Sequence, residues 1–385
     1  MSHSEPTPRK LPARAAAVAG IAATLVFSIA GCAKPPGTES GSSGAPSSSS
    51  SGGAATDSSS FKACMVSDSG GFDDKSFNQT SHKGLLDAKK KLGIETDQVE
   101  SKNDSDYANN MQAMVDAKCS VIVGVGFKLG DAILTAAKAN PDIDFAIVDD
   151  NEPRFKGVKN LKPLVFNTAQ SAFLGGYLAA SMTKTDKIGT FGGDKIPTVT
   201  IYMDGFAQGV EYYNKQNNKK VQVLGWNVDK QDGQFVPGSD GFKNIPGGKQ
   251  VASNLISQGA DIIFPVAGNS GVGALQAVKA SGGKVSSIWV DTDGCVSDAS
   301  YCSTMISSVY KSLDLAVEDA ITAAHDKNFS NEPYVGTLSN KGTGLTPYHD
   351  FASKVPEATT KKLDELKADI ISGKIKITSK AQPQT

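Results

Sequence analysis

The stretch Ala63-Cys-Met-Val66, followed by Ser67-Asp-Ser-Gly-Gly71, opens a pattern that continues through most of the chain. A short apolar run ends in a loop of small and polar residues, and a helical stretch at Ser81–Leu92 follows it. Further apolar runs of this kind lie at Val121–Val125, Phe145–Val148, Leu164–Phe166, Ile188–Phe191, Val221–Leu224, Ile262–Val266 and Ile288–Val290. Apolar runs that alternate with helices predict βαβ units and parallel sheets. Because one open sheet rarely holds so many strands, we predict an α/β fold with two doubly wound parallel-sheet lobes joined by a hinge.

We expect the first lobe to contain residues 61–165 and 295–330, and the second lobe 166–294 and 331–385. Asp291 then stands on a hinge strand, where the lobes close around a ligand. In doubly wound sheets, ligands bind at the carboxyl ends of the strands. The loops that follow the apolar runs are rich in glycine, which lets a ligand approach the backbone, and in carboxylates, which accept hydrogen bonds. They therefore carry the candidate binding residues.

The N-terminus has the parts of a secretory signal peptide. Basic residues up to Arg14 precede an apolar run, Ala15–Ala30, that is shorter than the roughly 20 residues of a membrane span. The run closes on Ile29-Ala-Gly-Cys32, which resembles the lipobox of bacterial lipoproteins, where lipid is attached to the cysteine. We expect removal of residues 1–31, lipidation of Cys32, and anchoring on the extracytoplasmic face of the cell membrane. The alternative is an ordinary signal peptide with a chance cysteine.

Residues 32–60 are predicted to be a flexible tether, since 35–60 consist almost entirely of Pro, Gly, Ser, Ala and Thr. The whole chain has 39 basic and 40 acidic residues, and no basic stripe indicates nucleic-acid binding. Four cysteines follow the expected anchor. Outside the cell they are expected to pair, Cys295 with Cys302, and Cys64 with Cys119 if their strands are neighbours. The alternative is four reduced, partly buried cysteines.

One run of residues carries a more specific resemblance. Asp68-Ser-Gly-Gly-Phe-Asp-Asp-Lys-Ser-Phe-Asn-Gln79 resembles the opening signature of the basic membrane protein family, the purine nucleoside receptor-like lipoproteins that serve ABC transporters. Later segments fit in order, at Val123–Phe127, Phe145–Asp149, Gly205–Val210, Pro265–Asn269, Trp289–Asp291 and Ser307–Lys311. The chain departs from the family pattern in a Gly/Asp-rich insertion near Asp229–Gly248, and it is weakly matched beyond Asp350. The resemblance implies a type I periplasmic-binding-protein-like fold closing on a nucleoside for an ABC transporter permease.

The resemblance also suggests how a purine is held. Phe77 and Phe206, one from each lobe, are expected to stack on its two faces. Asn78 and Asp68 are expected to read its polar edge, because an amide supplies both donors and acceptors. Taken alone, each of the two phenylalanines is more typical of a core. Phe127 can face either the cleft or the core, and we leave it out of the predicted site.

The ribose of the nucleoside is expected to bind at the carboxyl ends of the strands. Asp149 and Asp291 can accept hydrogen bonds from vicinal ribose hydroxyls, and Lys311 can donate to the sugar. Gly268 lets the backbone approach the ligand. Carboxylates in this position disfavour phosphate, so nucleosides are expected in preference to nucleotides. Lys311 alone is more typical of a solvated surface, and Asp291 of a turn.

The sequence supports the hypothesis of an enzyme less well than that of a binding protein. Gly124–Gly130 resembles a dinucleotide fingerprint, but its spacing is wrong by one residue and it does not follow the first strand. Gly268-Asn-Ser-Gly271 lacks the second glycine of a nucleophile elbow. No histidine has a metal-ligand spacing, so we expect no catalysis, cofactor or metal. The remaining alternatives are a lipoprotein that binds a sugar or another small polar ligand, and a ligand sensor for a membrane receptor.

Overall fold

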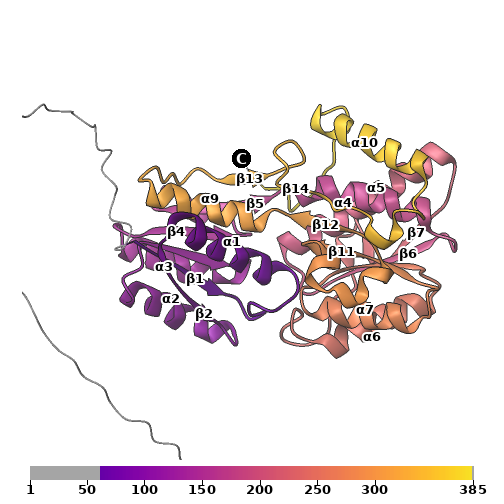
Figure 1. The fold of residues 1–385 in the computed structure, drawn as a ribbon. Helices are drawn as coiled ribbons and strands as arrows, with labels where there is room; N and C mark the ends of the chain where they lie inside the picture. The colour runs from indigo at the N-terminus through magenta and orange to yellow at the C-terminus, as the bar shows by residue number, and fades with distance from the viewer. Residues whose placement is uncertain (1–60, 384–385) are drawn as a thin grey trace, which may run out of the picture. The chain divides into compact units, whose positions relative to one another are not determined.

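The computed structural model describes residues 61–383, which form two six-stranded sheets and the helices that cover them (Figure 1). The predicted signal peptide, Cys32 and the tether lie outside the described residues. The first sheet has the order β13-β5-β4-β3-β1-β2, and all of its pairs are parallel. Its strands are β1 (Lys62–Ser67), β2 (Glu95–Glu100), β3 (Val121–Val125), β4 (Asp144–Val148), β5 (Leu161–Phe166) and β13 (Tyr334–Gly336).

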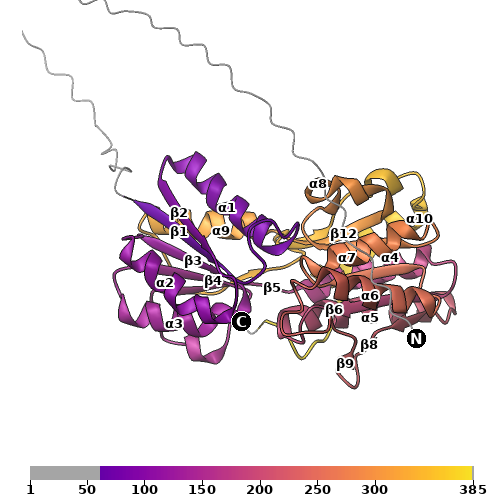
Figure 2. The same ribbon diagram turned by 90° about the horizontal axis from the view of Figure 1, so that it is seen from below.

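Helices cover both faces of the first sheet, as Figure 2 shows. They are α1 (Phe77–Leu92) and α9 (Leu313–His325) on one face, and α2 (Tyr107–Asp116) and α3 (Gly130–Ala139) on the other. Alternate residues of a strand point to opposite faces. Accordingly Ala63 and Met65 of β1 pack with α1 and α9, whereas Cys64 and Val66 pack with α2 and α3. Burial on both faces explains why the inner strands β1, β3 and β4 are largely apolar.

The second sheet has the order β14-β12-β11-β10-β6-β7, and only β14 is antiparallel to its neighbour. Its strands are β6 (Lys187–Gly192), β7 (Gln222–Leu224), β10 (Ile262–Val266), β11 (Ser286–Asp291), β12 (Met305–Lys311) and β14 (Thr343–Leu345). A short hairpin, β8 (Trp226–Asn227) and β9 (Asp232–Gly233), stands apart from it. The two sheets confirm the predicted α/β fold with two parallel-sheet lobes.

The second sheet is also covered on both faces (Figure 1). One face carries α4 (Thr168–Met182), α5 (Pro197–Asn217) and α10 (Glu357–Ile371), and the other carries α6 (Ile245–Ser257) and α7 (Ser270–Ala280). The short helix α8 (Gly294–Ser297) follows β11. None of the helices among residues 61–383 combines the length and the apolar character needed to cross a membrane.

The segment boundaries of the lobes differ from the predicted ones in two places. Strand β12 lies within 295–330, which we assigned to the first lobe, yet it pairs with β11 and β14 in the second sheet. Strand β13 lies beyond residue 330 but pairs with β5 in the first sheet. The chain therefore crosses between the sheets after β5, after β12 and between β13 and β14. A strand's own apolar pattern shows that it is buried but does not show which sheet it joins.

Helices α4 and α5 pack closely because glycines replace bulkier side chains where they meet. A Cβ atom at Gly205 or Gly209 of α5 would clash with the backbone of Ala169 or Phe173 of α4. The two glycines are four residues apart and so share one face of α5. The motif around Gly205 that resembles the family therefore has a structural role as a helix-packing surface.

The structure contains two disulfide bonds, Cys64–Cys119 and Cys295–Cys302. Their Cα atoms are 5.9 Å and 4.5 Å apart. Cys64 lies in β1 and Cys119 lies just before the neighbouring strand β3, so the first bond fastens the beginning of two adjacent strands. Cys295–Cys302 closes a loop between β11 and β12.

Candidate functional site

A pocket with an empty volume of about 610 Å³ lies between the two lobes, at the carboxyl ends of their strands. Seven of the eight predicted ligand-binding residues line the pocket: Asp68, Phe77, Asn78, Asp149, Gly268, Asp291 and Lys311. Residues predicted from the rule that ligands bind at strand ends therefore lie around one pocket.

A buried ion cluster forms part of the pocket wall. Asp149 follows β4 of the first lobe, whereas Asp291 and Lys311 end β11 and β12 of the second. The Lys311 ammonium contacts the Asp149 carboxylate and lies 3.5 Å from Oδ1 of Asp291. Both aspartates have positive φ angles, 67° and 65°. Such backbone is costly for residues other than glycine and is concentrated at functional sites, which supports a binding role for this cluster.

Further contacts fix Asp291 from both lobes. Its Oδ2 accepts a hydrogen bond from the Ser76 hydroxyl at 2.8 Å, and its Oδ1 accepts one from the Tyr202 hydroxyl at 2.9 Å. Ser76 precedes α1 in the first lobe, and Tyr202 belongs to α5 in the second. Asp291 thus joins the lobes directly, and a ligand that bonds to it meets a carboxylate of fixed orientation.

The ionisation of the cluster follows from burial and pairing. Burial raises the pKa of Asp149 to about 6, although the neighbouring Lys311 acts in the opposite direction. Burial would lower the pKa of Lys311, but Asp149 and Asp291 outweigh it and raise this pKa above its ordinary value. At neutral pH a lysinium ion therefore lies beside the ionised Asp149 carboxylate, and the pair can donate to and accept from ligand hydroxyls.

A second polar group lies at the start of α1. Asn78 donates through Nδ2 to Oδ1 of Asp68 at 2.8 Å, and Gly70 N–H donates to the same oxygen at 3.0 Å. Burial raises the pKa of Asp68. Asp74 accepts backbone hydrogen bonds from the first turn of α1, and burial raises its pKa to about 7. Among the described residues, the buried Oδ1 of Asn78 has no hydrogen-bond partner, so it remains available to a ligand donor.

Aromatic side chains form much of the remaining lining. They are Phe77, Phe127, Tyr202 and Phe242. Phe242 precedes α6 in the second lobe, whereas Phe77 begins α1 in the first. The Lys311 ammonium lies 4.9 Å from the centre of the Phe77 ring. Rings from both lobes therefore line one pocket.

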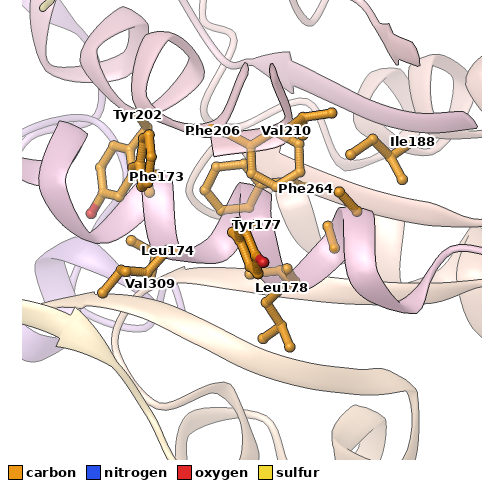
Figure 3. Close-up of a cluster of buried hydrophobic side chains, with 14 of the residues drawn as sticks. Phe173, Leu174, Tyr177, Leu178, Ile188, Tyr202, Phe206, Val210, Phe264 and Val309 are labelled. Carbon is orange, nitrogen blue, oxygen red and sulfur yellow. The ribbon is translucent and has the colours of Figure 1, made fainter. Parts of the chain in front are cut away.

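The structure places Phe206 elsewhere and corrects its predicted role. Phe206 is fully buried on α5 and stacks on Phe264 of β10, with ring centres 4.7 Å apart (Figure 3). It does not line the pocket. The face of α5 that carries Gly205 and Gly209 is taken up by α4, and Phe206 is directed to the sheet. Phe206 is thus a core residue.

Sequence reasoning missed several lining residues, among them Phe242, Tyr202, Thr198, Asn269 and Lys128. Phe242 lies in the Gly/Asp-rich insertion Asp229–Gly248, where the chain departs from the family pattern. The signal there is aromatic residues within a glycine-rich loop, Phe235 and Phe242, of which only Phe242 lines the pocket. An aromatic residue in such a loop needs either a core or a ligand to cover it.

The same segment also closes the mouth of the pocket. The Ser69 hydroxyl of the first lobe donates to Oδ2 of Asp240 at 2.5 Å. The Lys243 ammonium donates to the carbonyl of Lys102 at 2.7 Å, and Lys128 forms an ion pair with Asp194 at 2.8 Å. These contacts join loops of the two lobes, so the structure has the geometry of a closed cleft.

The described residues contain one group with metal-ligand atom types, Asp293, Cys295 and His349. Cys295 is in a disulfide bond, so its sulfur is not a free thiolate. Nε2 of His349 lies 2.8 Å from Oδ2 of Asp293, which forms a polar link between the loop after β11 and the segment after β14. This hydrogen bond and the disulfide bond explain why the three side chains lie close together.

The chain is similar in sequence to a known protein family and to several characterised proteins. The family model described as Bmp, ABC transporter substrate-binding protein PnrA-like, matches residues 61–381. A CD4+ T-cell-stimulating antigen of Listeria monocytogenes is 32% identical over 83% of this chain and 88% of its own length. The ABC transporter nucleoside-binding protein BmpA of Lactococcus lactis is 30% identical over 95% of this chain and 99% of its own length.

Solved structures show the same fold. An ABC transporter solute-binding protein of Aeropyrum pernix superposes with a TM-score of 0.73 at 24% identity, over 84% of this chain and 94% of its own. Substrate-binding proteins of ABC transporters act outside the cytoplasm and are not enzymes, as the sequence analysis predicts. The family model matches most of the chain, and the solved structure shares its fold. The chain belongs to the Bmp family of PnrA-like ABC transporter substrate-binding proteins.

Proposed function

We propose that this protein captures purine nucleosides between its two lobes and delivers them to the permease of an ABC transporter. The observation that carries the proposal is one pocket that combines aromatic faces from both lobes with a buried carboxylate–lysine cluster. The Lactococcus lactis relative, which has a nucleoside-binding name, supports the same ligand class.

The base is assigned to the aromatic part of the pocket. Phe77 and Phe242 come from different lobes, and stacking of a purine between them contributes about 1–3 kcal/mol for each ring. Within residues 61–383 the buried Oδ1 of Asn78 has no partner, which suits an N–H donor on the edge of the base. Asp68 adds a carboxylate acceptor next to it. A purine has both the flat faces and the polar edge that these side chains complement.

The ribose is assigned to the ion cluster. Asp149 and Asp291 are acceptors for vicinal hydroxyls, and Lys311 between them is a donor for the sugar oxygens. Gly268, with φ of 49°, lets the backbone come close to the ligand. Four carboxylates line the pocket against the cations Lys128 and Lys311, so a phosphate is disfavoured. Of these, Asp74, Asp149 and Asp291 are buried, and Asp68 is partly buried.

Titration calorimetry with adenosine, guanosine, ribose and adenine tests the ligand class. We expect the nucleosides to bind with micromolar or tighter affinity, about −8 kcal/mol or better, and without turnover. Free ribose lacks the stacking surface and adenine lacks the hydroxyls, so each is expected to bind more weakly. Ribose binding as tightly as the nucleosides, or no heat from any purine, would favour a sugar or another small polar ligand.

Substitution of the two clamp residues tests the binding geometry. Phe242→Ala and Phe77→Ala are each expected to weaken nucleoside binding by about 1–3 kcal/mol through lost stacking. Phe235→Ala is the matched control, because Phe235 lies in the same segment as Phe242 but packs on Trp226 and does not line the pocket. Calorimetry should show the loss in the first two variants only. Equal losses in all three would contradict the assignment of Phe242.

We also propose that Cys32 carries the lipid anchor that holds the protein at the extracytoplasmic face of the membrane. The proposal rests on the apolar run and the Ile29-Ala-Gly-Cys32 sequence. One acyl chain binds a membrane only marginally, whereas two or more, as on a lipoprotein cysteine, anchor it stably. Cys32→Ser is expected to move the protein from the membrane fraction to the soluble fraction outside the cytoplasm. Retention of the variant on washed membranes would exclude Cys32 as the anchor.

A further inference from the structure

A second pocket adjoins the ligand pocket on the other side of the ion cluster. It has an empty volume of about 740 Å³ and shares Phe127, Asp149, Thr198 and Lys311 with the ligand pocket. Asp149 and Lys311, which the proposed function assigns to the sugar, therefore stand at the junction. A ribose bound at this ion pair has the base pocket on one side and the second pocket on the other.

The second pocket has walls from both lobes and from the C-terminal segment. Strand β5 contributes Val165 and Phe166, and Lys380–Pro383 form a further wall. The segment leading to this wall is fastened to α5. Ser379 donates to Oδ2 of Asp204 at 2.6 Å, and Gln208 donates to the carbonyl of Thr378 at 2.7 Å. The pocket is thus bounded by a positioned segment of chain.

A buried hydroxyl in this pocket has no partner. Thr168 is fully buried and lines the second pocket, and its Oγ1 lacks a hydrogen-bond partner among the residues that the structure describes. A buried hydroxyl without a partner is uncommon, because its desolvation is not compensated. Thr168 begins α4, while Pro197 and Thr198 begin α5, and neither helix has a side-chain cap. A polar atom of a ligand can satisfy the hydroxyl.

The charges around the second pocket favour an uncharged group. Asp150 and Glu152 line it, and Arg154 pairs with both of them, while Lys311 pairs with Asp149. A phosphate placed there would meet three carboxylates, with Lys380 as the further cation on the opposite wall. The remaining lining is largely apolar. A short apolar substituent with one polar atom fits this combination.

We propose that the second pocket is a subsite for an uncharged substituent on the 5′ carbon of the nucleoside, so that 5′-thioether nucleosides are ligands as well as plain nucleosides. The proposal rests on the proposed function, because that function places the sugar at Asp149 and Lys311. It adds a ligand class that the base pocket alone does not specify. The thioether chain lies against the apolar walls, and Thr168 lines the same pocket.

Calorimetry of the full chain with adenosine, 5′-methylthioadenosine and AMP tests the subsite. We expect 5′-methylthioadenosine to bind within about threefold of adenosine or more tightly, and AMP to bind at least about a hundredfold more weakly. Ala381→Trp, which places a large ring in the second pocket, is expected to weaken 5′-methylthioadenosine binding at least about tenfold and to leave adenosine within about twofold. Ala381 lies in the irregular C-terminal segment, where a larger side chain is tolerated more readily than in a sheet or helix.

Thr168→Val provides a second variant with nearly the same shape. It removes the unpartnered hydroxyl, so the free protein is expected to be at least as stable as the wild type in thermal unfolding. It is also expected to weaken binding of 5′-methylthioadenosine more than binding of adenosine. A lower unfolding temperature for Thr168→Val would show that the hydroxyl has a partner and would remove that support.

The outcomes separate the subsite from the proposed function. Adenosine binding with 5′-methylthioadenosine at least about tenfold weaker would overturn the subsite and leave the nucleoside function intact. Equal weakening of both ligands by Ala381→Trp, or of neither, would also overturn it, and AMP binding more tightly than 5′-methylthioadenosine would show an anion site instead. No binding of any of the three ligands would overturn both proposals.

Discussion

Replacement of Lys311 by methionine is expected to lower the free energy of unfolding by about 3–5 kcal/mol at neutral pH, and to abolish nucleoside binding. Lys311 is only 4% exposed, and methionine has a similar length without the charge. The change leaves Asp149 and Asp291 buried without their shared cation. The cost is large because an unpaired buried carboxylate loses hydration and gains nothing in return. It also removes the donor that we assign to the sugar.

The pH dependence of this variant has a defined sign. Burial raises the pKa of Asp149 to about 6 even with Lys311 beside it, and loss of that cation raises the pKa further. A carboxyl whose pKa is higher in the folded than in the unfolded state loses stability as the pH rises through the folded pKa. The deficit of Lys311→Met is therefore expected to be larger at about pH 7.5 than at about pH 5, where Asp149 is protonated.

Urea unfolding followed by circular dichroism at both pH values measures this effect. The matched control is Lys83→Met, since Lys83 is mostly exposed and pairs with Asp314 at 2.8 Å and with Asp87 at 2.5 Å. Exposed ion pairs contribute about 0–1 kcal/mol, so the control is expected to stay near the wild type. A Lys311→Met variant as stable as this control would mean that the cluster is not buried as the structure shows.

The apolar pattern predicts the central strands well, for a physical reason. Strands β1, β3 and β4 are covered by helices on both faces, so their burial is visible as continuous apolar sequence. Strand β2, Glu95–Glu100, escapes the same reasoning. It is at the edge of its sheet and pairs only with β1, and its sequence is almost entirely polar. A strand that has solvent around it carries no apolar signal.

Local sequence cannot specify which sheet the late strands join. Strand β12 is almost entirely buried, yet its assignment to the second sheet depends on pairing with β11 and β14. The chain then passes directly into α9, which packs on α1 of the first lobe. Lys311 is the last residue of β12, so the crossing point itself supplies a site residue.

The residues of the candidate site also divide into those that the sequence can predict and those that it cannot. Asp68, Asp149 and Asp291 could be predicted because they follow apolar runs, and strand ends converge in this fold. Phe242 could not, because a loop has no periodicity from which the direction of a side chain follows. Phe206 was assigned to the pocket from a resemblance, but the direction of a helical side chain depends on what its neighbours on the helix contact. Gly205 and Gly209 contact α4, which directs Phe206 into the core.

Phe206→Ala is expected to destabilise the protein by about 3–5 kcal/mol, because it removes a fully buried ring and leaves a cavity beside Phe264. Nucleoside affinity of the folded variant is expected to stay within about twofold of the wild type, since Phe206 does not line the pocket. Phe242→Ala provides the opposite pattern, with weaker binding and less than about 1 kcal/mol lost in stability, because Phe242 is only partly buried. Urea unfolding and calorimetry on both variants separate the two roles. If Phe206→Ala lost affinity while keeping wild-type stability, the ring would have to contact the ligand, and Phe206 rather than Phe242 would be the second half of the clamp.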